Sequence, residues 1–338
     1  MNYSRAFVRL NWVALILIYL VVVAGSFVRI TGSGMGCPDW PKCFGEWIPP
    51  TTDENLPENY KDIYSEKRAK KVEKFSNFLS RIGLEETAEK LKNDPNLLVE
   101  QDFNGRKTWT EYVNRLVGFL SGNALLLAFL WILLKYRKRK LILLTFVNLI
   151  LMGVQAWFGS IVVASNLVPW TITVHMFLAL VIIGIQLYVI RMISPSQQTN
   201  LSVDKWVRYL LILCFGITVY QMFLGTQVRE YIDELIKMGY NQSEWVEMVG
   251  MPFYIHRSFS WGVLILLTYV AWRNEKANKY APIRWLYVIL ALELITGVLL
   301  AYAEMPGIAR TAHLVFASAM FGIMTMLMFR AKSARLDN

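Results

Sequence analysis

The chain has 338 residues, of which 55% are hydrophobic and only 18% are charged. Soluble globular proteins usually carry about 25% charged residues, and here apolar runs of about 20 residues, the length that crosses a bilayer as a helix, recur along the sequence. The composition therefore excludes a soluble enzyme, a disordered chain and a nucleic-acid-binding protein, and the formal net charge of +10 is interpreted as a sign of membrane topology.

Eight membrane-spanning helices are predicted in chain order, which makes the expected fold class an all-α membrane protein. The first apolar run is too long and too lightly flanked by charge to be a cleaved signal peptide. The expected spans are approximately 9–29, 110–134, 141–163, 170–193, 206–228, 253–273, 281–303 and 308–330.

The distribution of charge predicts the orientation of these helices. When both termini and the even-numbered connections are placed on one side, that side holds a large excess of basic residues, including the run at 135–140. By the positive-inside rule this side is cytoplasmic. The absence of an Arg- and Ser-rich transit segment favours the bacterial inner (cell) membrane over that of an organelle.

Two outer connections are polar, and they differ in length. Residues 30–108 form a long outer loop, in which residues 60–91 place apolar side chains at helical spacing between charges of both signs. This pattern predicts one or two short amphipathic helices with a solvated face rather than a lipid-binding patch. Residues 229–252 are expected to form a second, shorter outer loop.

An internal repeat divides the chain into two units. Three segments of the first half resemble three segments of the second half, in the same order, and Gln155 and Gly159 align with Glu293 and Gly297 in the same register. The repeat predicts two tandem, pseudo-symmetric four-helix bundles: residues 1–195, which include the long outer loop, and residues 196–338. The matching segments are 25–29 with 225–229, 111–115 with 253–257, and 173–176 with 311–314.

The repeat places all three histidines of the chain at equivalent positions. His256 and His313 begin the sixth and eighth spans at equal depth, about one helical turn below the outer surface. Two neutral imidazoles on different helices of a bundle are what axial ligation of haem iron requires. In the first unit the equivalents are Asn114 and His175, so only one strong iron ligand remains there. Histidines that simply form hydrogen bonds between helices are the alternative.

Several charged and polar residues accompany these positions. Glu111 lies one turn before Asn114 on the same helix face. There it can act as a base or stabilise a developing cation. Alternatively, it is only an acidic residue near the helix N-terminus, where the helix dipole stabilises a negative charge. Gln155 and Glu293 lie deeper and have either a functional role or a structural hydrogen bond between the units. Four arginines near the outer ends are either partners of haem propionates or snorkelling anchors: Arg29, Arg115, Arg229 and Arg257.

Cys37 and Cys43 lie just outside the first span, on the predicted outer side. A disulfide is expected there because this side of the membrane is oxidising. An exposed disulfide in a short loop is also open to exchange with a thiol oxidoreductase.

These residues resemble the haem A synthase family over essentially the whole chain. The resemblance rests on residues 31–45 with their two cysteines, on residues 111–115, and on His175, His256 with its neighbours, and His313. It implies an oxidoreductase acting on a CH group of haem O, which converts the C8 methyl to a formyl group and yields haem A for cytochrome c oxidase. It also implies a haem b cofactor on His256 and His313, a substrate haem beside His175 and Glu111, and a disulfide between Cys37 and Cys43.

The chain departs from the family pattern in two places. Asn114 stands where the family has a histidine, and the segment between Cys43 and Glu111 is longer than the family leads us to expect, which suggests a surface for a partner or lipid. The expected partners are haem O synthase, an electron acceptor and the lipid bilayer, and a homo-oligomer remains open. Two other functions also remain open: a di-haem b-type membrane electron carrier, which predicts two similarly ligated haems, and a haem-transfer or assembly protein, which predicts release of unmodified haem.

Overall fold

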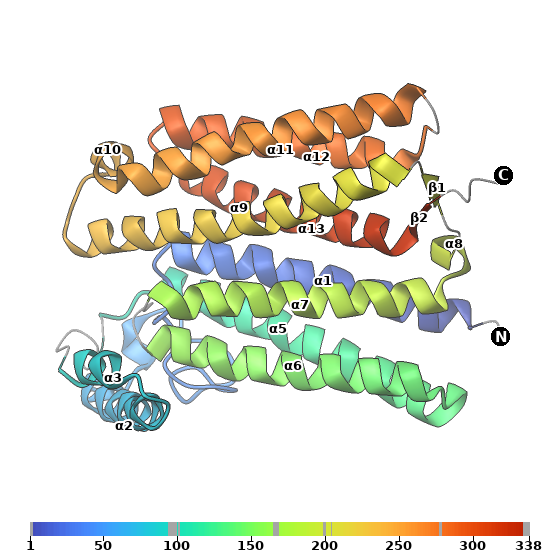
Figure 1. The fold of residues 1–338 in the computed structure, drawn as a ribbon. Coiled ribbons are helices and arrows are strands. Elements are labelled where there is room, and N and C mark those ends of the chain that lie inside the picture. Colours follow the sequence, from blue (N-terminus) through green and yellow to red (C-terminus); the bar gives the residue numbers. More distant parts are fainter. Residues whose placement is uncertain are drawn as a thin grey trace.

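The computed structural model describes residues 3–93, 100, 102–164, 169–198, 201–203, 205–276 and 279–333. Long helices that run side by side make up most of the molecule (Figure 1). Their bounds are α1 Arg5–Ile30, α5 Gly105–Trp131 with the π-helical turn Ile132–Tyr136 after it, α6 Arg139–Ala164, α7 Pro169–Ile193, α9 Lys205–Lys237, α11 Met251–Lys276, α12 Ala281–Tyr302 and α13 Gly307–Arg330.

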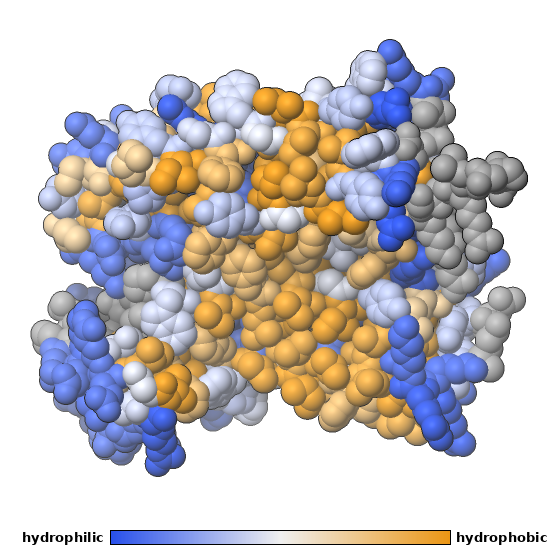
Figure 2. Space-filling view, in the orientation of Figure 1, coloured by the Kyte–Doolittle hydropathy of each residue, from blue (hydrophilic) through white to orange (hydrophobic). Residues whose placement is uncertain are grey.

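Seven of these helices are long and apolar enough to cross a membrane, which confirms a multi-pass membrane protein. On the face that Figure 2 shows, apolar residues fill the middle of the molecule and hydrophilic residues gather toward both ends. The helix outside this group is α11, which covers the sixth expected span and packs against α9 and α12. Polar residues of its first turns, among them His256 and Arg257, reduce its hydropathy, so the prediction of eight spans is confirmed for seven.

The helices pack in two sets. One set contains α1, α5, α6 and α7, and the other contains α9, α11, α12 and α13; the sets meet through α1, α7, α9 and α13. A shared apolar core lies along this junction and includes Leu15, Ile183, Met222 and Phe321. Because each set presents apolar side chains both inward and toward the other set, its helices are hydrophobic on more than one face.

The start of α5 positions the first candidate residue. Asn104 lies just before the helix, and its Oδ1 accepts a hydrogen bond from the backbone N–H of Lys107. This satisfies one of the free donors of the first turn. Glu111 follows within the next turn and so lies at the end of the bundle that adjoins the long connection between α1 and α5.

Two helices of the long connection between α1 and α5 lie at this same end of the bundle (Figure 1). They are α2, Tyr60–Arg81, and α3, Glu85–Lys92, with a short 3-10 turn before them at Asp53–Asn55. The apolar face of α2, with Val72 and Leu79, packs against Leu91 of α3 and Ile161 of α6. The prediction of amphipathic helices in this segment is therefore confirmed.

Both termini lie at the opposite end of the bundle (Figure 1). There the short helix α8, Pro195–Gln198, precedes β1, Leu201–Val203, which pairs in parallel with β2, Ala331–Ser333. The described residues thus contain two strands of three residues each in addition to the helices.

The expected outer loop at 229–252 is largely helical. The helix α9 continues to Lys237, and a 3-10 turn at Gln242–Glu244 and the helix α10, Trp245–Val249, follow it. Hydropathy falls at Arg229, but Ile232 and Leu235 of the extension pack against Trp245 and Phe253. This packing stabilises the helix beyond the apolar stretch, so the prediction that α9 ends at 228 is wrong.

Candidate functional site: a histidine pair and a buried glutamate

The structure brings His256 of α11 and His313 of α13 together. Their ring centres are 6.3 Å apart and their planes are inclined by 83°. Two bonds of about 2 Å to one metal ion, added to the distance from each ring centre to its nitrogen, account for this separation. The donor set suits haem iron, because the porphyrin supplies the in-plane nitrogens and the protein need supply only axial ligands.

In the part of the chain that the structure describes, no group of three or more His, Cys, Asp or Glu side chains is placed to hold a metal ion. The histidine pair therefore differs from a protein-only metal site, which needs about four ligands. A prosthetic group that brings its own nitrogens fits the pair better than a bare ion does.

A glycine of a neighbouring helix faces each of the four repeat-related positions. A Cβ added to Gly225 would lie 3.2 Å from Cε1 of His256, and one added to Gly297 would lie 3.5 Å from Cε1 of His313. These glycines leave room for the rings where a side chain would press on them.

The same relation holds in the first set of helices. A Cβ added to Gly159 would lie 3.2 Å from Cε1 of His175, and one added to Gly25 would lie 3.8 Å from Oδ1 of Asn114. The alignment of Gly25 with Gly225 and of Gly159 with Gly297 thus has a physical basis, because each glycine provides space beside the equivalent position.

His175 has a different environment from His313. The ring of Phe158 stacks on it, with ring centres 6.3 Å apart, and among the described residues its Nδ1 has no hydrogen-bond partner. Gln155 donates through Nε2 to the backbone carbonyl of His175 at 3.0 Å. The hydrogen bond that Gln155 forms thus lies within its own set of helices and not between the units, which was one of the two alternatives for this residue.

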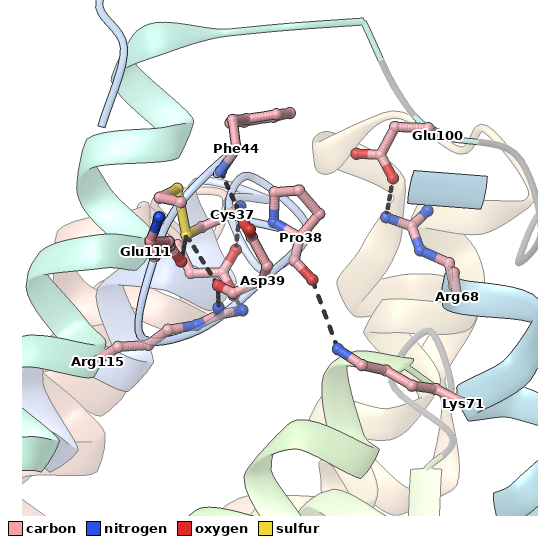
Figure 3. Close-up of polar contacts among 11 residues, drawn as sticks. Cys37, Pro38, Asp39, Phe44, Arg68, Lys71, Glu100, Glu111 and Arg115 are labelled. Carbon is pink, nitrogen blue, oxygen red and sulfur yellow. Dashed lines mark hydrogen bonds and ion pairs between the residues drawn. A yellow bond between two sulfur atoms is a disulfide. The ribbon is translucent and has the colours of Figure 1, made fainter. Parts of the chain in front are cut away.

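Glu111 is almost fully buried, with 1% of its surface exposed. Its Oε2 accepts a hydrogen bond of 3.0 Å from the backbone N–H of Cys37, and its Oε1 forms an ion pair with Arg115, one turn further along α5. Arg115 also donates through Nη1 to the carbonyl of Asp39 at 2.8 Å. Figure 3 shows this network, in which α5 and the loop that carries Cys37 and Cys43 (the cysteine loop) hold the carboxylate between them.

The cysteine loop is itself closed by the predicted disulfide, since Cys37 and Cys43 are bonded. Both cysteines are buried, with 1% and 0% of their surface exposed, so the expectation of an exposed disulfide is wrong. Within the loop, the carboxylate of Asp39 accepts hydrogen bonds from the backbone N–H groups of Phe44 and Gly45, at 2.7 and 3.0 Å. These bonds hold the shape of the loop, and the Cys37 N–H joins the loop to Glu111 (Figure 3).

The helix α2 also contacts the cysteine loop. Nζ of Lys71 lies 3.5 Å from the carbonyl of Pro38. Burial lowers the pKa of Lys71, and the nearby charge of Arg115 lowers it further. The glycine at position 36 lets the loop approach α5 closely, because a Cβ there would lie 2.7 Å from the backbone of Lys107.

The arginines singled out in the sequence have partners within the protein. Arg29 of α1 and Arg229 of α9 both form ion pairs with Asp233, which lies on the extension of α9. Arg257 lies over the ring of Tyr254 at 5.2 Å. Sequence reasoning missed Asp233 because it lies in the predicted loop, and it missed Asp39 because a loop aspartate has no periodic pattern to identify it.

A cavity of about 540 Å³ lies apart from these residues. It is lined by apolar side chains of α6, α7, α9 and α13, among them Phe177, Phe215 and Phe321. It includes none of the candidate ligands, so the site rests on the histidine pair and on the Glu111 network rather than on this cavity.

Comparison with known proteins identifies a family. Residues 8–325 match the family described as cytochrome oxidase assembly protein (COX15-CtaA). A protein of Wolbachia pipientis wMel named Heme A synthase is 24% identical to the chain over 334 residues, which cover 91% of this chain and 87% of the relative.

Two further relatives carry the same name. The one from Geobacillus kaustophilus is 23% identical, covering 93% of this chain and 88% of its own length. The one from Azorhizobium caulinodans is 27% identical, covering 92% and 82%. Because the family match spans nearly the whole sequence, the chain belongs to the COX15-CtaA family of cytochrome oxidase assembly proteins.

Proposed function

We propose that this chain is a haem A synthase, a membrane oxidoreductase that converts the C8 methyl group of haem O to a formyl group and so provides haem A for cytochrome c oxidase. The family match and the relatives named Heme A synthase support this activity. The observation that carries it is the pair of histidine rings, 6.3 Å apart, in a chain whose other half holds a buried glutamate at the equivalent end.

The second unit, residues 196–338, is proposed to bind haem b. His256 and His313 would hold its iron, and Gly225 and Gly297 make room for their rings. When bound, haem b supplies one-electron redox chemistry. The protein's contribution is to present two imidazoles from different helices and to exclude water from them.

The first unit, residues 1–195, is proposed to bind haem O. His175 is its one strong ligand, because Asn114 stands at the position equivalent to His256. A single strong ligand leaves the other face of the substrate iron free for water, oxygen or a weak contact with Asn114. This asymmetry favours an enzyme over a di-haem electron carrier, which would need two similar ligand pairs.

Glu111 is proposed as the catalytic carboxylate. As the methyl group is oxidised, it loses protons and carbon gains positive character, and a carboxylate in a buried site can accept a proton or stabilise that charge. The Cys37 N–H and Arg115 hold the Glu111 oxygens in fixed directions. The cysteine loop is thereby part of the site, and a thiol oxidoreductase that exchanges its disulfide would alter the position of Glu111.

The remaining assignments follow from the same arrangement. Two tandem four-helix bundles, eight spans, cytoplasmic termini and haem sites near the outer face are supported by the two sets of helices and by the termini lying opposite α2 and α3 (Figure 1). Arg29 and Arg115 are proposed near the propionates of the substrate, and Arg229 and Arg257 near those of haem b. Haem O synthase and an electron acceptor are the proposed partners.

Glu111→Gln tests the proposal in cells that make haem O but no haem A. The extracted haems are separated by chromatography and identified by mass. Wild type is expected to form haem A, and Glu111→Gln to form about a hundredfold less, the low end for loss of a general base. Glu100→Gln is the matched control, because Glu100 is also buried against an arginine, Arg68, but lies in the outer segment.

Haem A from wild type and from Glu100→Gln, but not from Glu111→Gln, is the expected pattern. Equal haem A from wild type and Glu111→Gln would remove this residue from the mechanism. Only haem B and haem O from a folded wild-type protein would contradict the proposed function and favour a haem carrier or transfer protein.

A further inference from the structure

Two side chains of α12 meet the imidazole of His313 on the ring nitrogen Nδ1. Oγ1 of Thr296 lies 3.0 Å from it and Oε1 of Glu293 lies 3.3 Å from it. Glu293 and Thr296 are three residues apart and so lie on the same face of the helix. Both Glu293 and His313 are shielded from solvent, with 14% and 24% of their side chains exposed.

The hydrogen bonds of Thr296 determine which nitrogen of His313 carries the proton. Its Oγ1 lies 3.0 Å from the carbonyl of Leu292 and 2.9 Å from that of Glu293, so its hydroxyl proton is donated to the backbone of α12. Thr296 can then meet His313 only as an acceptor. On this basis we assign the hydrogen of His313 to Nδ1, which leaves on Nε2 the lone pair that a metal ion requires.

The equivalent positions of the first unit lack this arrangement. Gln155 and Phe158 stand where Glu293 and Thr296 stand, at the offset of the repeat. Gln155 donates to the backbone carbonyl of His175, and Phe158 stacks on the ring. Nδ1 of His175 and Nδ1 of His256 both lack a hydrogen-bond partner in the described ranges. His313 is thus the one of the three histidines whose Nδ1 is held by acceptors.

We propose that Glu293 and Thr296 are positioning residues, which orient His313 with Nε2 toward the iron of haem b and lower the reduction potential of that haem. The inference rests on the proposed function. An acceptor on the far nitrogen of a metal-bound imidazole makes it a stronger donor, and a stronger donor stabilises the ferric state more than the ferrous state. Among the described residues of the first unit, Nδ1 of His175 has no such acceptor, so the two haem sites would differ in reduction potential although the fold is repeated.

The test is a redox titration of purified protein in lipid nanodiscs, with the visible spectrum recorded at each potential. Glu293→Gln and Thr296→Val are compared with wild type. The matched control is Thr145→Val, which removes a buried threonine on α6 whose hydroxyl also bonds only to its own helix. Glu293→Gln and Thr296→Val are each expected to raise the ferrous-to-ferric ratio at a fixed potential about tenfold, which is about 59 mV for a one-electron couple.

The electron paramagnetic resonance spectrum of the ferric state gives a second readout, because it reports the orientation and donor strength of the imidazoles. Loss of haem from Glu293→Gln would leave Thr296→Val to carry the test, since its smaller change keeps the carboxylate. Potentials and spectra equal to wild type, in variants that retain the bis-imidazole haem, would overturn this inference alone. A wild-type protein with no bis-imidazole spectrum would overturn the proposed function and this inference with it.

Discussion

Asp233 offers a test of the contact between the two sets of helices. It pairs with Arg29 of the first set and with Arg229 of its own helix, and only 8% of its side chain is exposed. Asp233→Asn keeps the shape of the side chain but leaves two largely buried guanidinium groups without a carboxylate. Breaking a buried ion pair costs about 3–5 kcal/mol. Because the arginines are 20% and 17% exposed, water solvates them in part, and we expect a loss of about 3 kcal/mol in the free energy of unfolding.

The assay is unfolding by sodium dodecyl sulfate in mixed micelles, followed by tryptophan fluorescence. Arg229→Met and the double variant with Asp233→Asn complete a double-mutant cycle, which separates the interaction from other effects of each change. Glu66→Gln is the control, because the exposed pair of Glu66 with Lys70 is expected to contribute nothing measurable. An Asp233→Asn protein as stable as wild type, or a coupling energy of zero between Asp233→Asn and Arg229→Met, would refute the reasoning.

Two further predictions concern the haem site and the outer segment. In Gly225→Ala, the new Cβ lies 3.2 Å from Cε1 of His256 and displaces the ring. We therefore expect the affinity for haem b to fall about tenfold, the low end for changes beside a metal ligand. The control Gly262→Ala on α11, where a Cβ meets nothing within 4 Å, is expected to bind haem as wild type does, and equal losses in both variants would contradict the prediction. Burial raises the pKa of Glu100 although Arg68 lowers it, so the folded state holds the proton more tightly and stability is lost as the pH rises through this raised pKa. Thermal unfolding at a series of pH values should show this loss of stability in wild type and a smaller loss in Glu100→Gln. The same pH dependence in both proteins would contradict the role of Glu100.

The membrane helices could be predicted because the bilayer imposes their length. Each run of about 20 apolar residues must be helical to satisfy its own backbone, and neighbouring charges mark where it leaves the membrane. The end of α9 could not be predicted in this way. Its extension is amphipathic, and it is stabilised by Ile232 and Leu235 packing against residues of α10 and α11, a contact that hydropathy does not reveal.

The candidate site could likewise be predicted only in part. The positions of His256, His313 and their glycines could be predicted from the repeat, because each pair of neighbouring helices needs the same space at the same height. The loop N–H of Cys37 that holds Glu111, and the carboxylate of Asp233 that pairs with Arg229, both lie outside the expected apolar spans. Hydropathy does not identify these contacts, and only the folded chain brings them to the site.

Conversion of haem O by the purified protein tests the proposed activity most directly. Wild type and His313→Met are reconstituted with haem b, supplied with haem O, oxygen and an electron acceptor, and their haems are separated by chromatography and identified by mass. We expect haem A from wild type and none from His313→Met, because the second unit needs both imidazoles to hold its haem. Haem O recovered unchanged from a wild-type protein that has bound haem b would contradict the assignment of this chain as a haem A synthase.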